Sequence, residues 1–287
     1  MNENELRQMV REVLTGMTDI PKNMPVANAG QTLDLDVPDI SAIDLQQELY
    51  VENPHDEAAY REMKQATSAR IGVGRAGPRP NCKTLLRFRA DHAAAMDAVF
   101  NDVAEETIGE MGLLLVKSSA ADRSEHLMDP NTGRRFDEET SRLIKEKCKS
   151  GAQVQIVVSD GLSSTAVEEN IRDLLPALTQ GLQRHGISVG TNLFVKFGRV
   201  GIGDAVGGLL QPDIVIVLLG ERPGLVTNAS LSCYMTYKPA PGMAESSRTV
   251  VSNIYKSGTP PSEAGAYIAD IAQKMLAAKA SGIDLKL

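Results

Sequence analysis

The chain has 287 residues, of which 42% are hydrophobic and only 4% aromatic, and its formal net charge is −7. No 18-residue window is free of charge, which argues against a membrane span, and no basic block is present to drive nucleic-acid binding. Three widely separated cysteines (Cys82, Cys148, Cys233) and the lack of a signal-peptide pattern predict an intracellular protein without structural disulfides or a cysteine metal site.

The N-terminal segment, residues 1–20, is predicted to form an amphipathic helix. Its apolar residues recur at i, i+3, i+4, i+7 and i+8: Leu6, Met9, Val10, Val13 and Leu14. Residues 21–45 are rich in Pro, Gly, Asn and Asp, which is typical of a flexible linker. A helix tethered in this way can dock on a partner. Periodicity alone is equally compatible with packing on the chain's own domain.

Residues 46–150 are predicted to form a mainly helical domain, with helices over 53–65, 83–100 and 137–148. Between the first two lies ARIGVGRAGPRPNCKT, whose glycines and prolines forbid a continuous helix. Arg70, Arg75 and Arg79 gather positive charge in this loop. The loop is compatible with an anion site, with a partner-docking loop or with a solvated turn.

Residues 151–287 are predicted to form a Rossmann-like, mostly parallel α/β domain. Strands are expected over 153–159, 188–198, 213–220 and 230–238, and the chain closes with a helix over about 262–280. The strand QVQIVVS is a near-continuous β-branched run, as a parallel strand buried on both faces requires. Because helical segments separate the strands, we expect an α/β sheet with helices on both faces.

Three loops follow these strands, at the edge where α/β sheets bind ligands. SDGLSS has the glycine and hydroxyl residues of a phosphate-binding turn, although an ordinary capped turn fits it equally well. FGRVGIGDAVGG places Arg199 just after a strand and can also be a plain connection into a short helix. In GERPGL, Glu221 can accept hydrogen bonds from a polar ligand or pair with an arginine.

Catalytic motifs are scarce. The four histidines (His55, His92, His126, His185) lie in unrelated contexts, without a metalloprotease motif, a nucleophile elbow or a cysteine beside a base. Each is more simply interpreted as a surface or core histidine than as a ligand. Three ligand-facing loops without an acid, base or nucleophile predict a binding module, or a subunit that completes the active site of another chain.

The sequence resembles the small subunit family of ethanolamine ammonia-lyase from about Val51 to its carboxyl terminus. The likeness rests on blocks in the same order and with similar spacing: ARIGVGRAGPRP, LLRFRADHA, VVSDGLSS, FVKFGRV, LLGERPGL, SLSCYMTY, RTVVSNI, GTPPSEA and KASGI. The resemblance implies an adenosylcobalamin-dependent lyase that converts ethanolamine to acetaldehyde and ammonia. It further implies a large TIM-barrel subunit that binds the substrate, so no catalytic residue is expected here, and an assembly that is a hexamer of heterodimers.

Three cobalamin contacts follow from the resemblance alone: Val200 in FGRV, Glu221 in GERPGL and Val250 in RTVVSN, where relatives carry cysteine. The cofactor generates the radical, so the protein's task would be binding and orientation, which fits the missing catalytic groups. The cofactor's phosphate suits a helix N-terminus. We therefore hypothesise that four further residues line its nucleotide tail: Ser159, Asp160, Gly161 and Ser163.

The resemblance also implies packaging into a bacterial microcompartment within the cytoplasm. Docking of the helix over residues 1–20 on the shell, in the manner of a helix in a groove, is the preferred hypothesis for that segment. An assembly helix for the large subunit is the alternative. Two other classes remain open for the whole chain: a separate nucleotide-binding enzyme, and a structural partner that never touches a cofactor.

Overall fold

The structure is a computed structural model that describes residues 43, 47–67 and 69–286. The chain divides into two compact units, Met1–Asp39 and Ile40–Leu287, and the described residues all belong to the second. The expected amphipathic helix over 1–20 and the linker over 21–45 lie outside the described residues, apart from Ile43. Both therefore stay predictions.

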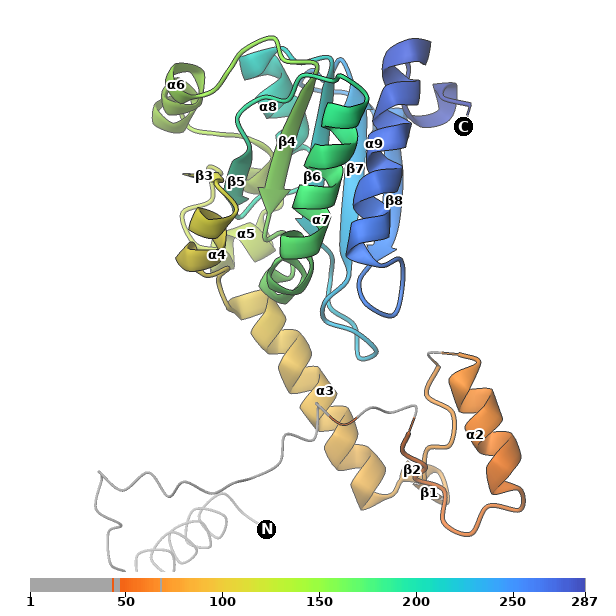
Figure 1. The fold of residues 1–287 in the computed structure, drawn as a ribbon. Coiled ribbons are helices and arrows are strands. Elements are labelled where there is room, and N and C mark those ends of the chain that lie inside the picture. Colours follow the sequence, from red (N-terminus) through yellow and green to blue (C-terminus); the bar gives the residue numbers. More distant parts are fainter. Residues whose placement is uncertain (1–42, 44–46, 68, 287) are drawn as a thin grey trace, which may run out of the picture. The chain divides into compact units, whose positions relative to one another are not determined.

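The centre of the described chain is a six-stranded sheet with the order β3-β5-β4-β6-β7-β8 (Figure 1). Its strands are β3 (Leu114–Lys117), β4 (Val154–Ser159), β5 (Leu193–Lys196), β6 (Ile214–Gly220), β7 (Leu231–Tyr237) and β8 (Arg248–Ile254). The first four strands in the sheet order run parallel, and β7 and β8 are each antiparallel to the strand before them. The predicted α/β fold with a mostly parallel sheet is confirmed.

The strands differ in how well the sequence predicted them. The expected strands at 153–159, 213–220 and 230–238 end within one residue of β4, β6 and β7. Residues 188–198 contain the shorter β5, preceded by an isolated bridge between Val154 and Val189. Strands β3 and β8 were not expected, because exposed positions interrupt both and leave no continuous apolar run.

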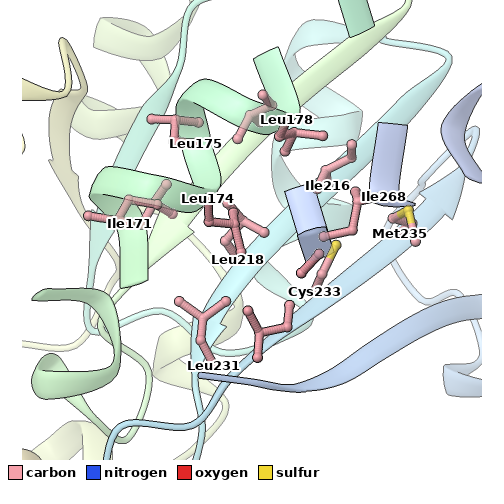
Figure 2. Packing of buried hydrophobic residues seen from close by; sticks show 14 of the residues in the cluster. Ile171, Leu174, Leu175, Leu178, Ile216, Leu218, Leu231, Cys233, Met235 and Ile268 are labelled. Carbon is pink, nitrogen blue, oxygen red and sulfur yellow. The ribbon is translucent and has the colours of Figure 1, made fainter. Parts of the chain in front are cut away.

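One face of the sheet is covered by α7 (Ser164–Arg184) and α9 (Pro261–Ala278), which lie side by side (Figure 1). Figure 2 shows Leu174 and Leu178 of α7 in one apolar cluster with Ile216 of β6 and Ile268 of α9. Every residue of β4 and β6 is buried, which explains why β6 is apolar throughout and β4 nearly so. This cluster is the larger of the two cores.

The opposite face is covered by α6 (Glu138–Lys147) and α8 (Ile202–Leu210). Ile144, Ile202 and Val206 pack there against side chains of β5 and β6. A buried ion pair ties α8 to β8, because Arg248 Nη1 and Nη2 each donate to one carboxylate oxygen of Asp204 at 2.8 Å. The sheet is thus a layer between two apolar clusters, as the sequence predicted.

The helices before the sheet start with side-chain caps that follow from the sequence. Helices α2 (Glu57–Gln65) and α3 (Cys82–Phe100) begin after Asp56 and Asn81, whose side chains accept from backbone amides at 2.9 Å. Helix α6 begins after Asp137, which caps it in the same way at 2.7 Å. The helices expected over 83–100 and 137–148 are confirmed, and the one expected over 53–65 begins four residues later.

The arginine-rich loop forms a two-stranded hairpin, β1 (Arg75–Ala76) with β2 (Arg79–Pro80). The expectation of a separate helical domain over 46–150 is not confirmed, because β3 of this segment belongs to the main sheet. The remaining short elements of the described chain are α4 (Glu105–Glu110), α5 (Arg123–Met128), and the 3₁₀ turns η2 (Thr132–Arg134), η3 (Glu245–Ser247) and η4 (Gly282–Asp284). Within the described residues, no helix combines the length and the apolarity that crossing a membrane requires.

Candidate functional site

A cavity of about 310 Å³ lies at the carboxyl ends of β4, β5 and β6. Its walls are Pro130, Arg134, Gly161, Leu162, Arg199, Val200, Leu219, Gly220, Glu221, Tyr234 and Glu245. The helices that follow β4 and β5 lie on opposite faces of the sheet, and these two strands are neighbours. This is the topological switch point at which open α/β sheets bind ligands. All three predicted loops contribute to the cavity.

The turn after β4 packs directly on the end of β6. Gly161 has a φ of +54°, and a Cβ atom at this position would lie 2.4 Å from the carbonyl oxygen of Gly220. The amide of Leu162 donates to that same oxygen at 2.9 Å. Only glycine satisfies both conditions, because other residues avoid this backbone conformation and would collide with the strand. Gly161 therefore forms part of the cavity wall through its backbone.

The three polar residues around Gly161 are buried, and their side chains bond within the chain. Ser159 Oγ accepts from the amide of Gly198 at 3.0 Å, and Asp160 Oδ1 accepts from the amide of Phe197 at 2.7 Å. Ser163 Oγ caps α7 and donates to the carbonyl oxygen of Asn228 at 2.5 Å. These bonds hold the loops after β4 and β5 together. Direct contact of these side chains with a cofactor stays a prediction.

Asp160 is a buried carboxylic acid beside an arginine. Its Oδ2 lies 3.1 Å from Nη1 of Arg123, and its side chain is 1% exposed. Burial raises the pKa of Asp160, and the positive charge of Arg123 opposes that shift. The guanidinium of Arg123 also lies over the ring of Phe197, 4.7 Å from its centroid. Arg123 thus connects α5 with the ends of both β4 and β5.

Glu221 lies in the cavity wall and bonds to Tyr234, whose hydroxyl donates to Glu221 Oε1 at 2.5 Å. Burial, together with this carboxylate, raises the pKa of Tyr234. The phenol therefore stays protonated and acts as a donor. This bond orients one carboxylate oxygen of Glu221, and Oε2 has no hydrogen-bond partner in the part of the chain that the structure describes.

The loop after β5 brings an apolar and a cationic side chain to the cavity. Val200 is half-buried against the second core, and Arg199 Nη2 donates to the carbonyl oxygen of His126 at 2.8 Å. Burial lowers the pKa of Arg199, and the nearby charge of Arg134 lowers it further. Two guanidinium groups at one wall favour carbonyl or phosphate oxygens on a ligand.

Val250, the third contact implied by the resemblance, is not among the cavity's lining residues. It lies on β8, paired across the sheet with Tyr234 of β7, and is 48% exposed. The structure thus brings Gly161, Val200 and Glu221 around one cavity and places Val250 one strand beyond Tyr234.

His126 supports the Gly161 turn of the cavity wall, a role that no sequence motif indicates. Its side chain is fully buried, and Nε2 lies 2.8 Å from the carbonyl oxygen of Gly161. Burial lowers the pKa of His126 to about 4, so the ring is neutral at pH 7 and its Nε2–H donates to Gly161. The ring also stacks on Phe197 with 5.7 Å between centroids. His126 is a core histidine, as interpreted from the sequence.

Tyr234, Arg123 and Glu245 were also missed, because each comes from a different element and no local motif joins them. Tyr234 is one of two half-buried tyrosines in the otherwise buried β7, and the sequence does not distinguish it from Tyr237. Within the described residues, no three His, Cys, Asp or Glu side chains are grouped as a metal ion requires. The site is suited to hold a polar ligand by hydrogen bonds rather than to bind a metal directly.

The fold and the cavity define an α/β ligand-binding protein whose site lies at a switch point. A family model described as "Ethanolamine ammonia-lyase light chain (EutC)" matches residues 57–286. The chain is 49% identical to the ethanolamine ammonia-lyase small subunit of Clostridium perfringens, with 100% of both chains covered. It is 51% identical to that of Clostridium tetani, covering 100% of this chain and 99% of the relative, and 46% identical to that of Listeria monocytogenes, covering 100% of both. The chain belongs to the ethanolamine ammonia-lyase light chain family, which confirms the resemblance and with it the class, an ammonia-lyase subunit.

Proposed function

We propose that the chain is the small subunit of an adenosylcobalamin-dependent ethanolamine ammonia-lyase and holds one edge of the cofactor. The proposal rests on one observation: Val200 and Glu221, implied by the resemblance as cobalamin contacts, and Gly161, hypothesised to line its nucleotide tail, surround a single cavity at the switch point. Together with a large subunit, the chain would support conversion of ethanolamine to acetaldehyde and ammonia.

The size of the cavity supports a shared site. At about 310 Å³ it is at the lower end of the range of about 300–1,000 Å³ that encloses a drug-sized ligand. Adenosylcobalamin is considerably larger than such a ligand, so only part of it fits here. The rest of the cofactor requires a second protein surface, which agrees with a subunit that contributes half of a composite site.

The donors and acceptors of the wall also fit this cofactor. Cobalamin carries amide side chains, a ribose and a phosphate. Glu221 can accept from amide N–H or hydroxyl groups, while Arg134 and Arg199 can donate to carbonyl or phosphate oxygens. Val200 offers an apolar contact. When bound, the cofactor supplies the radical chemistry, and this chain's residues hold it in position and exclude water.

In this proposal, Ser159, Asp160 and Ser163 act mainly by keeping the turn at Gly161 in place. Their hydrogen bonds join the ends of β4 and β5 and the start of α7, so the cavity wall is formed before a ligand arrives. A change in any of them would alter cofactor affinity through the turn. Val250 would contribute at most an apolar surface beside Tyr234.

To test this proposal, the purified chain is mixed with its large subunit, with and without hydroxocobalamin, and the mixture is separated by size. We expect a stable complex whose corrin absorbance co-elutes with both subunits and is lost when either is omitted. Cobalamin that binds the large subunit alone with full affinity would favour the purely structural partner. A nucleotide-dependent activity of the isolated chain would instead favour a separate enzyme.

The finer features of the assembly belong to the same proposal. The large subunit would be a TIM barrel, the assembly a hexamer of heterodimers, and its location a bacterial microcompartment within the cytoplasm. Deleting residues 1–20 should spare activity and abolish encapsulation if that segment docks on the shell. Loss of the complex with the large subunit after the deletion would favour an assembly helix instead.

A further inference from the structure

Helix α3 buries one arginine and one aspartate and exposes several large apolar residues. Its buried side is Thr84, Arg87, Asp91, Ala95 and Ala98. Its exposed apolar side chains are Leu85, Leu86, Phe88, Met96 and Phe100, more than any other element of the described chain exposes. A helix that borders only water has the opposite arrangement, so the exposed side of α3 is built to contact protein.

A buried ion-pair cluster fixes this orientation. Arg87 Nε donates to Asp91 Oδ1 at 2.9 Å, and Arg70 Nη2 donates to Asp91 Oδ2 at 2.6 Å. Arg70 also donates to the carbonyl oxygen of Leu225 in the loop that follows β6. Rotating α3 to bury its apolar side would expose or separate these partners. Within the part of the chain that the structure describes, these contacts keep the apolar side of α3 outward.

The C-terminal half of α3 borders a groove of about 340 Å³. Its lining is His92, Ala95, Met96, Val99 and Phe100 of α3, with Arg222, Pro223, Gly224 and Leu225 of the loop after β6. This loop begins at the residue after Glu221, which lies in the cavity wall. The groove and the candidate cofactor site are thus joined through adjacent residues of one loop.

The exposed side of α3 has the spacing of a helix-packing surface. Leu85, His92, Met96 and Val99 recur at i, i+7, i+11 and i+14 and form a stripe about 21 Å long at 1.5 Å per residue. Phe88 and Phe100 flank this stripe. The exposed Arg89 and Arg222 make no ion pair with any residue that the structure describes. A partner helix with an apolar face and acidic flanking residues would complement both features.

We propose that the α3 stripe (Leu85, His92, Met96 and Val99), with the flanking Phe88 and Phe100, is the docking site for an amphipathic, acid-flanked helix of the large subunit. The inference rests on the proposed function, because a cofactor held only at one edge requires a second chain beside Glu221. The groove along the α3 stripe continues from that loop. A large subunit that covers the cofactor beside Glu221 would therefore also contact α3 along the same surface.

The test compares charge introduced into the α3 stripe with charge introduced elsewhere. The double variant Met96→Glu/Phe100→Glu is measured for binding to the purified large subunit without cobalamin, for example by sedimentation or calorimetry. We expect at least ~30-fold weaker binding, because buried aromatic contacts dominate interface energies. The control Ile283→Glu changes another apolar side chain, 80% exposed on η4, and should bind as the unmodified chain does.

A milder pair, Met96→Ala/Phe100→Ala, adds no charge and should weaken binding about tenfold. Unchanged thermal unfolding of both double variants in isolation would show that the fold is intact. The reversal Arg222→Glu should also weaken binding, and should do so more at low salt. These three results together would support the α3 stripe as the docking site.

Three outcomes would overturn the inference. One is large-subunit binding by Met96→Glu/Phe100→Glu equal to that of the unmodified chain. Another is a larger loss of large-subunit binding in the control variant Ile283→Glu than in Met96→Glu/Phe100→Glu. The third is a dimer of the isolated chain that the double variant dissociates, which would assign the stripe to a second copy. If the unmodified pair assembles but fails to retain hydroxocobalamin, the proposed function fails while the docking result still stands.

Discussion

The sheet and α3 each bury an arginine–aspartate pair, and the contrast between them is informative. At the sheet, Arg248 of β8 pairs with Asp204 of α8, and the neighbouring apolar side chains also point inward. In α3, Arg87 and Asp91 are buried while the large apolar residues point outward. The same pairing therefore completes a core in one region and presents an apolar surface in the other. The difference indicates which part of the chain needs a partner.

The largest expected effect is at the ion pair of the sheet. Asp204→Asn leaves Arg248 as a buried, partly unpaired charge, so we expect the free energy of unfolding to fall by about 3–5 kcal/mol in urea titrations. The control is the same change at Asp213, whose pair with Lys238 is largely exposed, where the loss should not exceed about 1 kcal/mol. Equal losses at the two sites would mean that the sheet pair is no more important than a surface pair.

The next largest effect is a loss of stability at acid pH that is caused by protonation of the buried His126. Burial holds its pKa at about 4 in the folded chain, against 6.5 for an ordinary histidine. As the pH falls, His126 is protonated in the unfolded chain before it is protonated in the folded chain. The contribution of the neutral His126 to the free energy of unfolding is therefore fully present above pH 6.5 and is lost progressively as the pH falls to 4. The loss should reach about 3 kcal/mol, at 1.36 kcal/mol per pKa unit. The measurement is the free energy of unfolding as a function of pH between 6.5 and 4. Its decrease with falling pH should disappear in His126→Gln and persist in His92→Gln, a change on the exposed side of α3.

The turn at Gly161 should show a smaller effect that is confined to the cofactor. Gly161→Val strains the left-handed backbone and collides with Gly220, so cobalamin binding should weaken about 10- to 100-fold while the helical circular dichroism of the isolated chain persists. Gly151→Val is the matched control, because Gly151 has a φ of +70° but no atom within 4 Å of its Cβ position. Unchanged affinity in Gly161→Val would remove this turn from the cofactor site. Large-subunit binding without cobalamin should be unaltered, since the α3 stripe is untouched.

The smallest expected effect is at Glu221. Glu221→Gln removes the charge but keeps the shape, so the apparent cobalamin constant should rise about tenfold with little change in the substrate constant. Tyr234→Phe frees the carboxylate from its donor and should shift the cobalamin constant in the same assay by a smaller factor. An equal loss in both constants for Glu221→Gln would argue against a cofactor role.

The sequence predicted elements well where the local pattern is sufficient. Strand β6 is a continuous apolar run and β4 a nearly continuous one, and both were located within one residue. Strand β3 has only four residues, two of them exposed, so its membership of the sheet depends on pairing with β5 and not on its own composition. Strand β8 mixes exposed and buried residues because it lies at the sheet edge.

The candidate site divides in the same way. Gly161 and Glu221 could be selected because they directly follow predicted strands, and parallel strands bring such residues to one edge. Tyr234 and His126 could not be selected, because their importance comes from contacts with residues 13 and 35 positions away. No spacing rule joins partners of that kind.

By itself the sequence determined the fold class, the family and the three loops that surround the cavity, because strand burial and turn chemistry are local properties of the chain. The tertiary structure alone decided which way the polar side chains point. Ser159, Asp160 and Ser163 bond inward, because folding brings backbone groups of neighbouring loops within hydrogen-bond distance of their side chains. It also decided that α3 exposes its apolar side, because Arg70 and Leu225, distant in sequence, hold its charged side against the chain.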